Sequence, residues 1–433
     1  MMTRSFTLLV VLAAMSLCVI ALVGVQASSF RQAAAARETV AAIRASWAAR
    51  AGLEAALAAL ESASESGSSV SPLALFDDLA RDSEGWVEGA SWLILHETPA
   101  GLVPGPADAH AKINVNLMSR NDLLMLDGMT EDMADSILDW IDADDSPRSL
   151  GAESGYYSQL PSPIEPRNGP VQSLFELELV AGVLPDLVRG EDWNLNAILD
   201  PNEDDGDASW PPDNADGILD AGWSEFATAA SREPALASTG EPKLDLKRAT
   251  AEQLLGRVPT LSRNQTIVIL DYAARGNNRI DDLLGVALST IAQQGAGLPT
   301  NVGELRRDQL ADLLDQCTFH DVGSAPVPGR VNINTVTRET LDRMSSISAG
   351  LADSLILARD SQPAGFASIT ELSRIPALTP NRLRQLARLI NVETGALVLC
   401  SRGRDAATGI EVQITATIDR TGIPVAISEA IVQ

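Results

Sequence analysis

The chain opens with a long apolar stretch. Residues 6–27 carry no charge, and as a helix at ~1.5 Å per residue they span roughly 33 Å, enough to cross the ~30 Å core of a bilayer. Alanine-rich sequence without proline continues over residues 28–60. This pattern predicts one long helix, with residues 6–27 in a membrane and residues 28–65 packed on a soluble domain. The apolar positions expected to form the packing face are Val40, Ile43, Trp47, Leu53, Leu57 and Leu60.

A cleaved secretory signal peptide is the alternative interpretation of this N-terminus. Such a signal also combines a basic start, here Arg4, with an apolar core and small residues before its cleavage site, here residues 25–27. Arginines lie mostly after the span, so charge asymmetry does not decide the matter. Because no break rich in proline or glycine follows the apolar run, the sequence favours a retained anchor.

Strand patterns occur at two places far apart in the chain. Residues 89–96 form one, and runs rich in β-branched residues at 396–401, 410–418 and 425–432 form the other. Strands near both ends with a helical middle predict one sheet interrupted by a large insertion. A sheet of this kind packed on the long helix would bury both apolar faces, which gives an α+β fold.

The middle of the chain contains an internal repeat. Residues 112–119, 243–250 and 330–337 share a pattern that ends in Ser or Thr, and such a hydroxyl caps a helix N-terminus. Each repeat is followed by a turn and a second amphipathic segment, at 134–140, 265–272 and 351–358. This arrangement predicts helix-hairpin-helix units. A further unit is expected at residues 369–389.

Helix-hairpin-helix units often bind DNA through their turn amides, so a membrane-anchored or exported DNA-binding protein, such as a competence-type receptor, is the alternative function. The composition argues against it, because 58 acidic residues face 32 Lys and Arg for a net charge of −26, and DNA affinity comes largely from basic residues. The last unit is the most basic. We therefore expect the hairpins to serve as packing modules and expect no nucleic-acid partner. The arginines of that last unit are Arg374, Arg382, Arg384 and Arg388.

An acidic stretch matches the spacing of an EF-hand calcium loop. Oxygen ligands stand at loop positions one, three, five, nine and twelve, with a backbone carbonyl at seven; these are Asp192, Asn194, Asn196, Asp200 and Glu203, with Ile198 at seven. Ala197 replaces the usual sixth glycine, at a cost of roughly 1–2 kcal/mol for a left-handed conformation. A weak Ca²⁺ site is predicted. A possible second metal group is Asp204, Asp205, Asp207, Asp213, Asn214, Asp216 and Asp220.

Other reactive residues indicate no catalytic site. Cys317 and Cys400 can form a disulfide in an oxidising compartment, but two buried, unpaired thiols are the favoured interpretation. The three histidines lack metal-ligand spacing. Because the sequence has no phosphate-binding loop and no nucleophile with a partner histidine, a non-enzymatic function is predicted.

A series of motifs resembles protein K of the bacterial type II secretion system, a minor pseudopilin. The motifs lie at residues 140–147, 151–157, 166–168, 173–182 and 331–337. The resemblance implies a pseudopilin fold, in which a long transmembrane helix packs on a small antiparallel sheet, with a large inserted region of helix-hairpin-helix (SAM-like) units and calcium in its first lobe. The segments expected are 1–5 leader, 6–27 membrane span, 28–65 periplasmic half of the helix, 66–111 first part of the sheet, 112–228 first lobe with the calcium loop, 229–390 second lobe and 391–433 closing strands.

The same resemblance implies how the N-terminus is processed. A prepilin peptidase would cut between Ser5 and Phe6, and Phe6 would be methylated; the usual residue before the cut is Gly rather than Ser. Most pseudopilins carry Glu at the fifth mature position, here Val10. A carboxylate at mid-bilayer costs ~2.5–3.5 kcal/mol, so its absence suits a subunit at a filament tip, which has no subunit ahead of it to neutralise.

The implied location and partners follow from this family. The protein would cross the bacterial inner membrane once, with its N-terminus in the cytoplasm and its bulk in the periplasm. With minor pseudopilins of the I and J types it would start and cap the pseudopilus.

Overall fold

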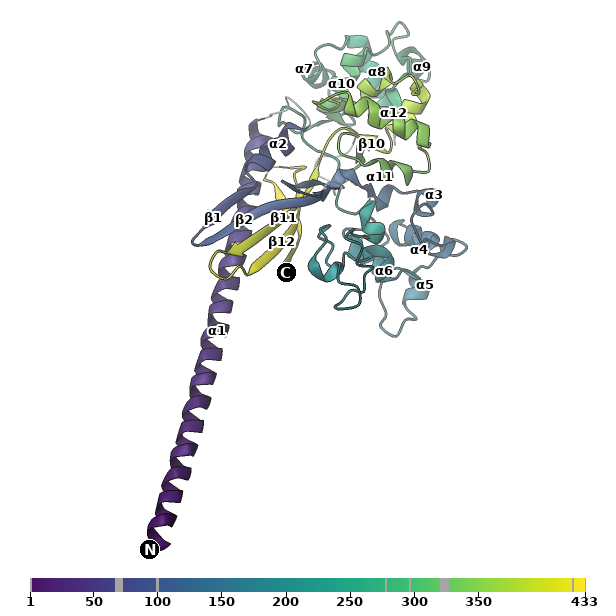
Figure 1. Ribbon diagram of the computed structural model, residues 1–433. Helices are drawn as coiled ribbons and strands as arrows, with labels where there is room; N and C mark the ends of the chain where they lie inside the picture. Colours follow the sequence, from purple (N-terminus) through teal and green to yellow (C-terminus); the bar gives the residue numbers. More distant parts are fainter. Residues whose placement is uncertain are drawn as a thin grey trace.

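The computed structural model consists of a long helix, a sheet packed on it, and a helical region beyond the sheet (Figure 1). It describes residues 2–66, 73–98, 101–276, 279–295, 297–319, 327–422 and 424–432, and within the long helix the side chains of residues 11–63. The expected α+β architecture is confirmed.

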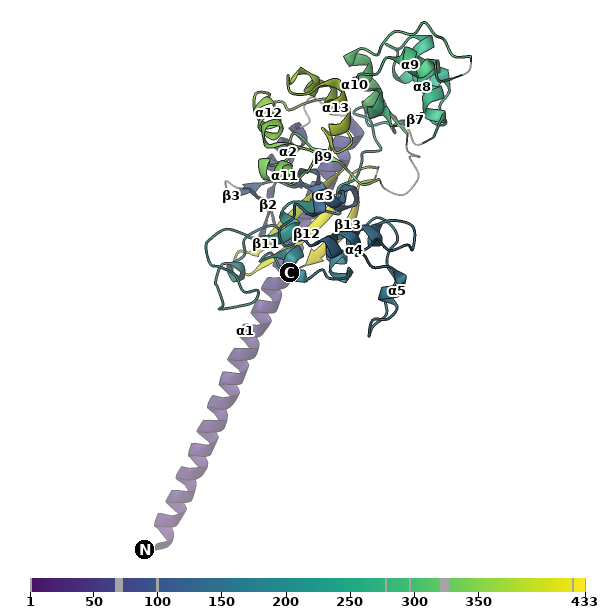
Figure 2. The ribbon, with the colours of Figure 1, turned by 90° about the vertical axis from the view of Figure 1, so that its right-hand side faces the viewer.

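The first helix, α1, runs from Met2 to Ser66 without interruption. Its N-terminal half extends away from the rest of the molecule, with every described side chain from Val11 to Val40 exposed (Figure 2). Within residues 11–63 it is long and apolar enough to cross a membrane, a test that a signal sequence also passes. It is the single described helix that meets these criteria.

The sheet is antiparallel and has the order β1-β2-β11-β12-β13, with β3 paired to β2 and β4 paired to β11. Its strands come from both ends of the chain, as expected, because β4 ends at residue 108 and β11 starts at residue 396. The bounds are β1 Glu84–Val87, β2 Ala90–Thr98, β3 Gly101–Pro104, β4 Ala107–Asp108, β11 Ala396–Asp405, β12 Glu411–Asp419 and β13 Ala426–Val432.

The face of α1 that packs on the sheet differs from the predicted one. Leu53 and Leu60 are buried as expected, but Val40, Ile43 and Trp47 are 47, 52 and 61% exposed. Alanines take their place against the sheet, because small side chains let the two backbones approach closely. The buried positions of the helix are Ala41, Ala45, Ala48, Ala49, Leu53, Ala56 and Leu60.

Two glycines show how close this approach is. A Cβ on Gly403 of β11 would lie 1.9 Å from the carbonyl oxygen of Ala45, and one on Gly52 of α1 would lie 2.4 Å from Ser401 Oγ. Ser401 Oγ also donates a hydrogen bond of 2.8 Å to the carbonyl of Ala49. The helix is thus held against the central strand by small residues on both sides.

Residues 109–395 form the inserted helical region, and the sequence repeat organises it. Each repeat supplies one strand of a two-residue parallel pair: β5 with β6, β7 with β8, and β9 with β10. Residues 229–390, which the sequence predicted to form one second lobe, therefore contain two units, each with its own strand pair, β7 with β8 and β9 with β10. The strands are β5 Ile113–Asn114, β6 Ala227–Thr228, β7 Leu244–Asp245, β8 Cys317–Thr318, β9 Val331–Asn332 and β10 Ile390–Asn391.

The helix-hairpin-helix pattern is present in each repeat. The predicted caps Ser119, Thr250 and Thr337 each accept a hydrogen bond from the third backbone N–H of the following helix, and the second helices α4, α8 and α12 lie where amphipathic segments were expected. The helices outside α1 are α2 Ala74–Arg81, α3 Arg120–Leu123, α4 Glu131–Ile141, α5 Ser154–Tyr157, α6 Pro185–Arg189, α7 Ala251–Arg257, α8 Arg263–Ala274, α9 Leu288–Ala292, α10 Arg307–Gln316, α11 Arg338–Asp342, α12 Ala349–Asp360 and α13 Pro380–Leu386.

The insertion is tied to the sheet by buried polar contacts at its base. The imidazole of His110 lies 2.7 Å from the carbonyl of Arg330 through Nδ1, and its Nε2 accepts the N–H of Gly395 at 3.0 Å. Asp108 Oδ2 accepts hydrogen bonds from Asn332, Thr335 and Thr394. These bonds join the two chain crossings between sheet and insertion, so the helical region is anchored where the chain leaves the sheet.

Candidate functional site

The predicted calcium loop has the internal hydrogen bonds of an EF-hand-like turn. The two carboxylate oxygens of Asp192 accept the backbone N–H groups of Asn196 and Ala197 at 3.0 and 2.9 Å. The side-chain oxygens of Asn194 and Asn196 accept the N–H groups two residues further on, at 3.0 and 2.7 Å. The first, third and fifth positions therefore all turn their oxygens inward.

The backbone of this loop takes the conformation that its sixth position requires. Ala197 has φ +55°, and Leu195 has φ +53°. Both lie in the left-handed region, which costs roughly 1–2 kcal/mol for a residue with a Cβ. The loop adopts this conformation because the hydrogen bonds to Asp192 and Asn194 enforce it.

Glu203, at position twelve, closes the loop. Its carboxylate accepts the N–H groups of Trp193 and Asp200 at 3.2 and 3.1 Å, and Asp200 in turn accepts the side-chain amides of Asn194 and Asn196 at 2.9 and 2.8 Å. Asp192 and Glu203 are both 1% exposed. The six predicted positions are thus brought into one small loop.

The electrostatics of the loop fit a divalent cation. Burial raises the pKa of Asp192 to about 6, and burial together with the charges of Asp192 and Asp200 raises the pKa of Glu203 to about 7. Lys112, whose Nζ donates to the carbonyl of Ser224 at 2.7 Å, acts on Asp192 only through its charge. Calcium binds oxygen ligands, and its positive charge would offset the repulsion between carboxylates that are buried close together.

The loop predicted to bind calcium also contacts the sheet. The N–H of Leu199 donates to Glu97 of β2 at 2.7 Å, and Arg402 of β11 lies 3.6 Å from Asp200. Ile198, whose carbonyl holds the seventh position, is itself 1% exposed. The loop therefore lies between the first helical unit and the antiparallel sheet, where its conformation affects how the two are held together.

The second acidic group contains a loop with the same turns. Asn214 Oδ1 accepts the N–H of Asp216, and Asp216 Oδ1 accepts the N–H of Ile218, both at 2.9 Å. The amide of Asn214 donates to Asp220 at 3.0 Å, as Asn194 does to Asp200. Ala215 and Gly217 have φ +52° and +77°. The two loops therefore share the same pattern of backbone hydrogen bonds and of positive φ angles.

Two carboxylates complete this second loop from outside it. Asp204 accepts the N–H of Gly217 at 2.9 Å, the role that Asp192 has in the first loop. Glu191 accepts the N–H groups of Asn214 and Asp220 at 3.0 and 3.2 Å, the role of Glu203. The sequence did not indicate Glu191, because its position 23 residues before Asn214 belongs to no linear motif; its place beside Asp192 was the one available signal.

Three members of the predicted second group do not join it. Asp213 accepts the backbone N–H groups of Asp205, Gly206 and Ala215 and so shapes a neighbouring turn. Asp205 accepts the N–H and hydroxyl of Ser209, and Asp207 is exposed. The group is therefore corrected to Asp204, Asn214, Asp216 and Asp220 with Glu191.

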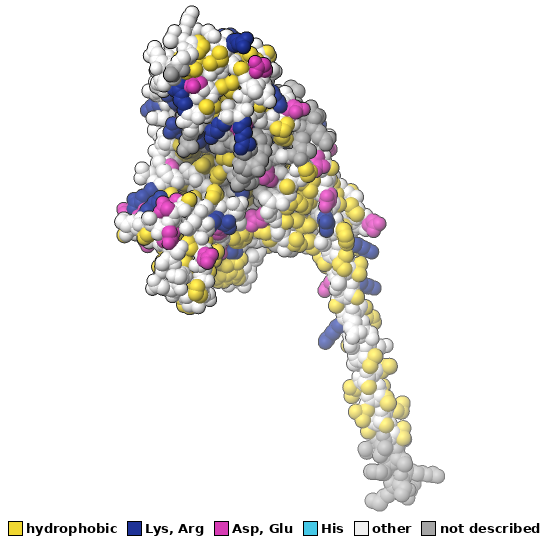
Figure 3. Space-filling view, turned by 180° about the vertical axis from the view of Figure 1, so that it is seen from behind, with side chains coloured by type: hydrophobic (Ala, Val, Ile, Leu, Met, Phe, Trp, Pro, Cys, Tyr) yellow, Lys and Arg dark blue, Asp and Glu magenta, His cyan; other side chains and the backbone are white. Residues whose placement is uncertain are grey.

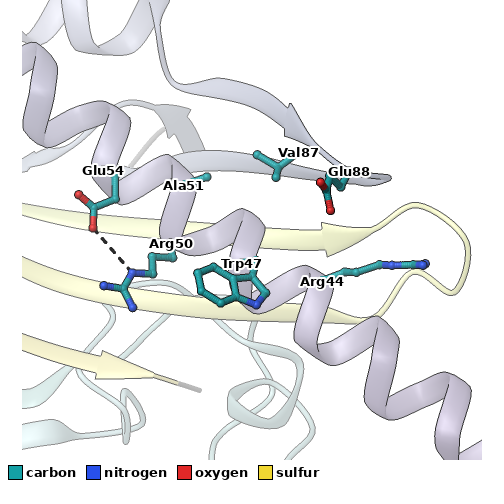
Figure 4. Close-up of a pocket in the computed structure, with 7 residues that line it drawn as sticks. All are labelled: Arg44, Trp47, Arg50, Ala51, Glu54, Val87 and Glu88. Carbon is teal, nitrogen blue, oxygen red and sulfur yellow. Dashed lines mark ion pairs between the residues drawn. The ribbon is translucent and has the colours of Figure 1, made fainter.

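The side of α1 turned away from the sheet carries the apolar side chains that were predicted to face it, Val40, Ile43 and Trp47. Trp47 projects from this side between Arg44 and Arg50, over a groove of 390 Å³ formed with β1 (Figure 4). Arg50 pairs with Glu54 at 3.7 Å. Apolar side chains are exposed along much of the rod (Figure 3). The outer surface of the helix thus carries exposed apolar side chains from Val11 up to Trp47 at the sheet, with arginines beside the last of them.

Other predicted residues have the following positions. The side chains of Ser5, Phe6 and Val10 and all of His320 lie outside the described residues. The possible disulfide is not formed: Cys317 is buried in the core of the helical region and Cys400 is buried in β11, both as free thiols. They are kept apart because they belong to different layers of the molecule.

The fold and these sites define a pilin-like scaffold of rod and sheet, enlarged by inserted helix-hairpin-helix units. Residues 107–190 match the family model described as type II secretion system (T2SS), protein K, and residues 328–391 match the model of a helix-hairpin-helix motif. The resemblance to protein K is therefore confirmed, and it is the inserted region's first unit that carries it.

Among solved structures, the chain is similar to one in the GspK-GspI-GspJ complex from the type 2 secretion system of enterotoxigenic Escherichia coli. The identity is 14% and the TM-score 0.47, with 92% of this chain and 99% of that chain covered. A search of curated proteins finds no significant match.

Proposed function

We propose that this protein is a minor pseudopilin of a type II secretion system that starts and caps the periplasmic pseudopilus. The observation that carries the proposal is the combination of two parts in one chain. The rod and its antiparallel sheet form a pilin-like scaffold, and residues 107–190, which run from β4 into the insertion, match the family model of protein K. The proposed work is mechanical, and no catalytic role is assigned.

The position of the insertion supports a place at the tip. The later units, with α7, α8, α10 and α12, lie at the end of the molecule opposite the N-terminus of α1, whereas the first unit, with α4 to α6, lies beside the sheet (Figures 1 and 2). Subunits of a filament built on parallel rods stack along the direction of α1. A further subunit added above this one would meet the inserted units, whereas subunits below would meet the rod.

The exposed face of α1 supports contact with other pseudopilins. Val40, Ile43 and Trp47 lie on the side of the rod that its own sheet leaves free, and exposed contiguous apolar surface marks interaction sites. We propose that the rods of pseudopilins of the I and J types pack against this stripe in the periplasm, and that their membrane segments continue the contact.

Fluorescent labelling in secreting cells tests the proposed place. A single label on the inserted region is expected at filament tips, and deletion of the gene is expected to abolish secretion or to change filament length. As a matched control, a labelled major pseudopilin should appear along the whole filament. A distribution of this protein along the filament would overturn the capping role.

We further propose that residues 6–27 stay in the inner membrane after a prepilin peptidase cuts between Ser5 and Phe6. The exposed, apolar N-terminal half of α1 supports a span. N-terminal sequencing of the membrane-bound protein should find a methylated Phe6. A mature chain that begins near Ser28 would replace this proposal with a soluble exported protein.

The two acidic loops are proposed to bind calcium. Residues Asp192, Asn194, Asn196, Asp200 and Glu203, with the carbonyl of Ile198, would hold one ion, and the second loop would bind another more weakly because it is exposed. The ion would neutralise buried carboxylates at the base of the first unit. Calorimetry of the full-length protein in detergent, with calcium and with chelator, should show heat and a rise in melting temperature; neither would be seen if the loops bind no metal.

DNA binding is the second candidate, favoured by the helix-hairpin-helix match at residues 328–391 and by Arg382, which is exposed on α13. Two nearby arginines are already paired, Arg374 with Glu371 and Arg388 with Asp282. Co-purification of DNA, rather than of other pseudopilins, with the protein from membranes would favour this candidate over the pseudopilin.

A further inference from the structure

The long helix α1 separates its charges along its length. Residues 28–50 contain four arginines and one glutamate, whereas residues 51–66 contain three glutamates and no basic residue. The chain as a whole has a net charge of −26, so an excess of arginine in this segment runs against its composition. Basic side chains, drawn in dark blue, project from this part of the rod in Figure 3.

The arginines flank the apolar side of the rod that the sheet leaves uncovered. Seven residues make almost two turns of a helix, so Val40, Trp47 and Glu54 follow one another along one line, and all three are exposed. Residues three positions apart are neighbours on a helix surface. Arg44 and Arg50 therefore lie on either side of Trp47, as Figure 4 shows.

The fold makes little use of these arginines. Arg37 is exposed and forms no ion pair among the residues that the structure describes. Arg50 lies 3.7 Å from Glu54, and both side chains are at least 60% exposed, so this pair adds little to stability. Arg44 lies 3.7 Å from Asp405 and is still half exposed. These three arginines, called the basic segment below, are therefore available to a partner.

The height of the basic segment excludes lipid as that partner. At ~1.5 Å per residue, Arg37 lies ~15 Å and Arg50 ~35 Å beyond residue 27, the end of the proposed membrane span. The headgroup layer extends only ~5–8 Å beyond the hydrocarbon core on each side. Arg31, at ~6 Å, is close enough to reach headgroups, but the basic segment is not. Its partner is therefore a protein.

A second copy of this chain does not fit the basic segment. Two parallel copies in register would place each arginine beside its own counterpart and Glu54 beside Glu54, and like charges brought together at an interface cost affinity. A different rod with acidic residues at this height fits both the charge and the direction of α1. Opposite charges of this kind mainly decide which partner binds and in which register.

Given the proposed role as a minor pseudopilin, on which this inference rests, we propose that the basic segment binds an acidic face on the rod of a neighbouring pseudopilin of the I or J type. That rod runs parallel to α1, and Trp47 packs on its apolar side chains. The neighbours of a tip subunit lie nearer the membrane than it does, so their rods pass the basic segment, whereas Glu54 and the glutamates after it lie above this contact.

Charge reversal in the full-length protein tests the proposal. The double variant Arg37→Glu/Arg50→Glu spares Arg44, because a carboxylate there would meet Asp405, whose side chain is 1% exposed. Titration of labelled protein with purified I-type and J-type pseudopilins in detergent measures the affinity. At about 0.05 M NaCl the double variant should bind its partner about tenfold more weakly than wild type, and at about 0.5 M the gap should close, because salt screens exposed charges.

The matched control is Arg81→Glu/Arg404→Glu, which changes the net charge by the same amount. Arg81 on α2 pairs with Asp78 and Arg404 on β11 pairs with Glu411, and both arginine side chains are more than 60% exposed. The control should bind as wild type does at both salt concentrations. Exchange of single acidic residues for Lys in the partner's rod should restore binding of the double variant and weaken binding of wild type.

The variant Trp47→Ala separates the apolar part of the contact from the charges. It should weaken binding equally at both salt concentrations, because loss of apolar contact is not screened. Wild-type affinity of the Arg37→Glu/Arg50→Glu variant, or an equal loss in the control, would overturn this inference while leaving the role in the filament intact. If anionic lipid co-purifies with wild type but not with the double variant, and partner affinity is unchanged, the arginines bind the membrane instead. Failure of wild type to bind either pseudopilin would overturn the proposed function as well.

Discussion

The two acidic loops of the first unit have the same turns and different surroundings. In both loops, two side-chain oxygens spaced two residues apart accept backbone N–H groups, an aspartate accepts an asparagine side-chain amide, and a glutamate accepts two further backbone N–H groups. In the first loop Asp192 and Glu203 are 1% exposed. In the second loop Glu191 is also buried, at 8% exposed, but Asp204, the counterpart of Asp192, is exposed, as are Asn214, Asp216 and Asp220.

This difference shows that burial, rather than the ligand pattern, determines how much ion binding at such a loop would add to the stability of the fold. Water screens and solvates the aspartates of the second loop, so an ion bound there would add little to stability. Asp192 and Glu203 of the first loop are buried, and this loop contacts the sheet through the N–H of Leu199 and the carboxylate of Asp200, so a bound ion would stabilise the junction between sheet and insertion.

The largest expected effect comes from removing one matched charge in each loop. Asp192→Asn should weaken calcium binding at the first loop by about 10- to 100-fold, since interactions of an ionised group are worth about 1.5–3 kcal/mol each and ~1.4 kcal/mol is tenfold. Asp220→Asn should weaken binding at the second loop only a few-fold. Calorimetric titration of both variants measures the two affinities. An equal loss of calcium affinity in both variants would contradict the expected difference between the loops.

An intermediate effect is expected from pH. Because the pKa of Asp192 is raised to about 6 and that of Glu203 to about 7, the folded protein binds more protons than the unfolded chain between pH ~4 and ~7. In chelator, the free energy of unfolding should therefore fall as pH rises through this window and level off above it. Calcium should offset the loss.

The variant Glu203→Gln should flatten that pH profile, while Asp220→Asn should leave it unchanged. Chemical denaturation in chelator at several pH values measures both. If the profile of Glu203→Gln follows wild type, the buried carboxylate of the first loop is not the group responsible.

The smallest effect is expected from relieving backbone strain. Ala197→Gly should raise the stability of the first loop by ~1 kcal/mol, because glycine adopts φ +55° without the Cβ clash. Ala215→Gly removes the same strain in the second loop, but it should raise the overall melting temperature less, since an exposed loop opens without unfolding the core. A lower melting temperature for Ala197→Gly would show that its φ is not strained.

Much of the fold was predictable from local pattern. The long apolar helix, the strands at both ends and the helix caps at Ser119, Thr250 and Thr337 all rest on residues close in sequence, and the structure has each of them. The internal hydrogen bonds of the first acidic loop were predictable for the same reason, because the residues that make them lie within twelve positions. The exposed face of α1 could not be predicted, because periodicity identifies the apolar positions of a helix but does not show which neighbour each of them contacts.

The sequence by itself determined the elements, the repeat and the linear ligand pattern, because each depends on short-range geometry and on the chemistry of single side chains. Only the tertiary structure decided that alanines rather than Val40, Ile43 and Trp47 face the sheet, since close packing of a helix on a strand selects small side chains. It also decided that Glu191 completes the second loop. Burial and long-range proximity arise from the whole chain, so no local pattern reports them.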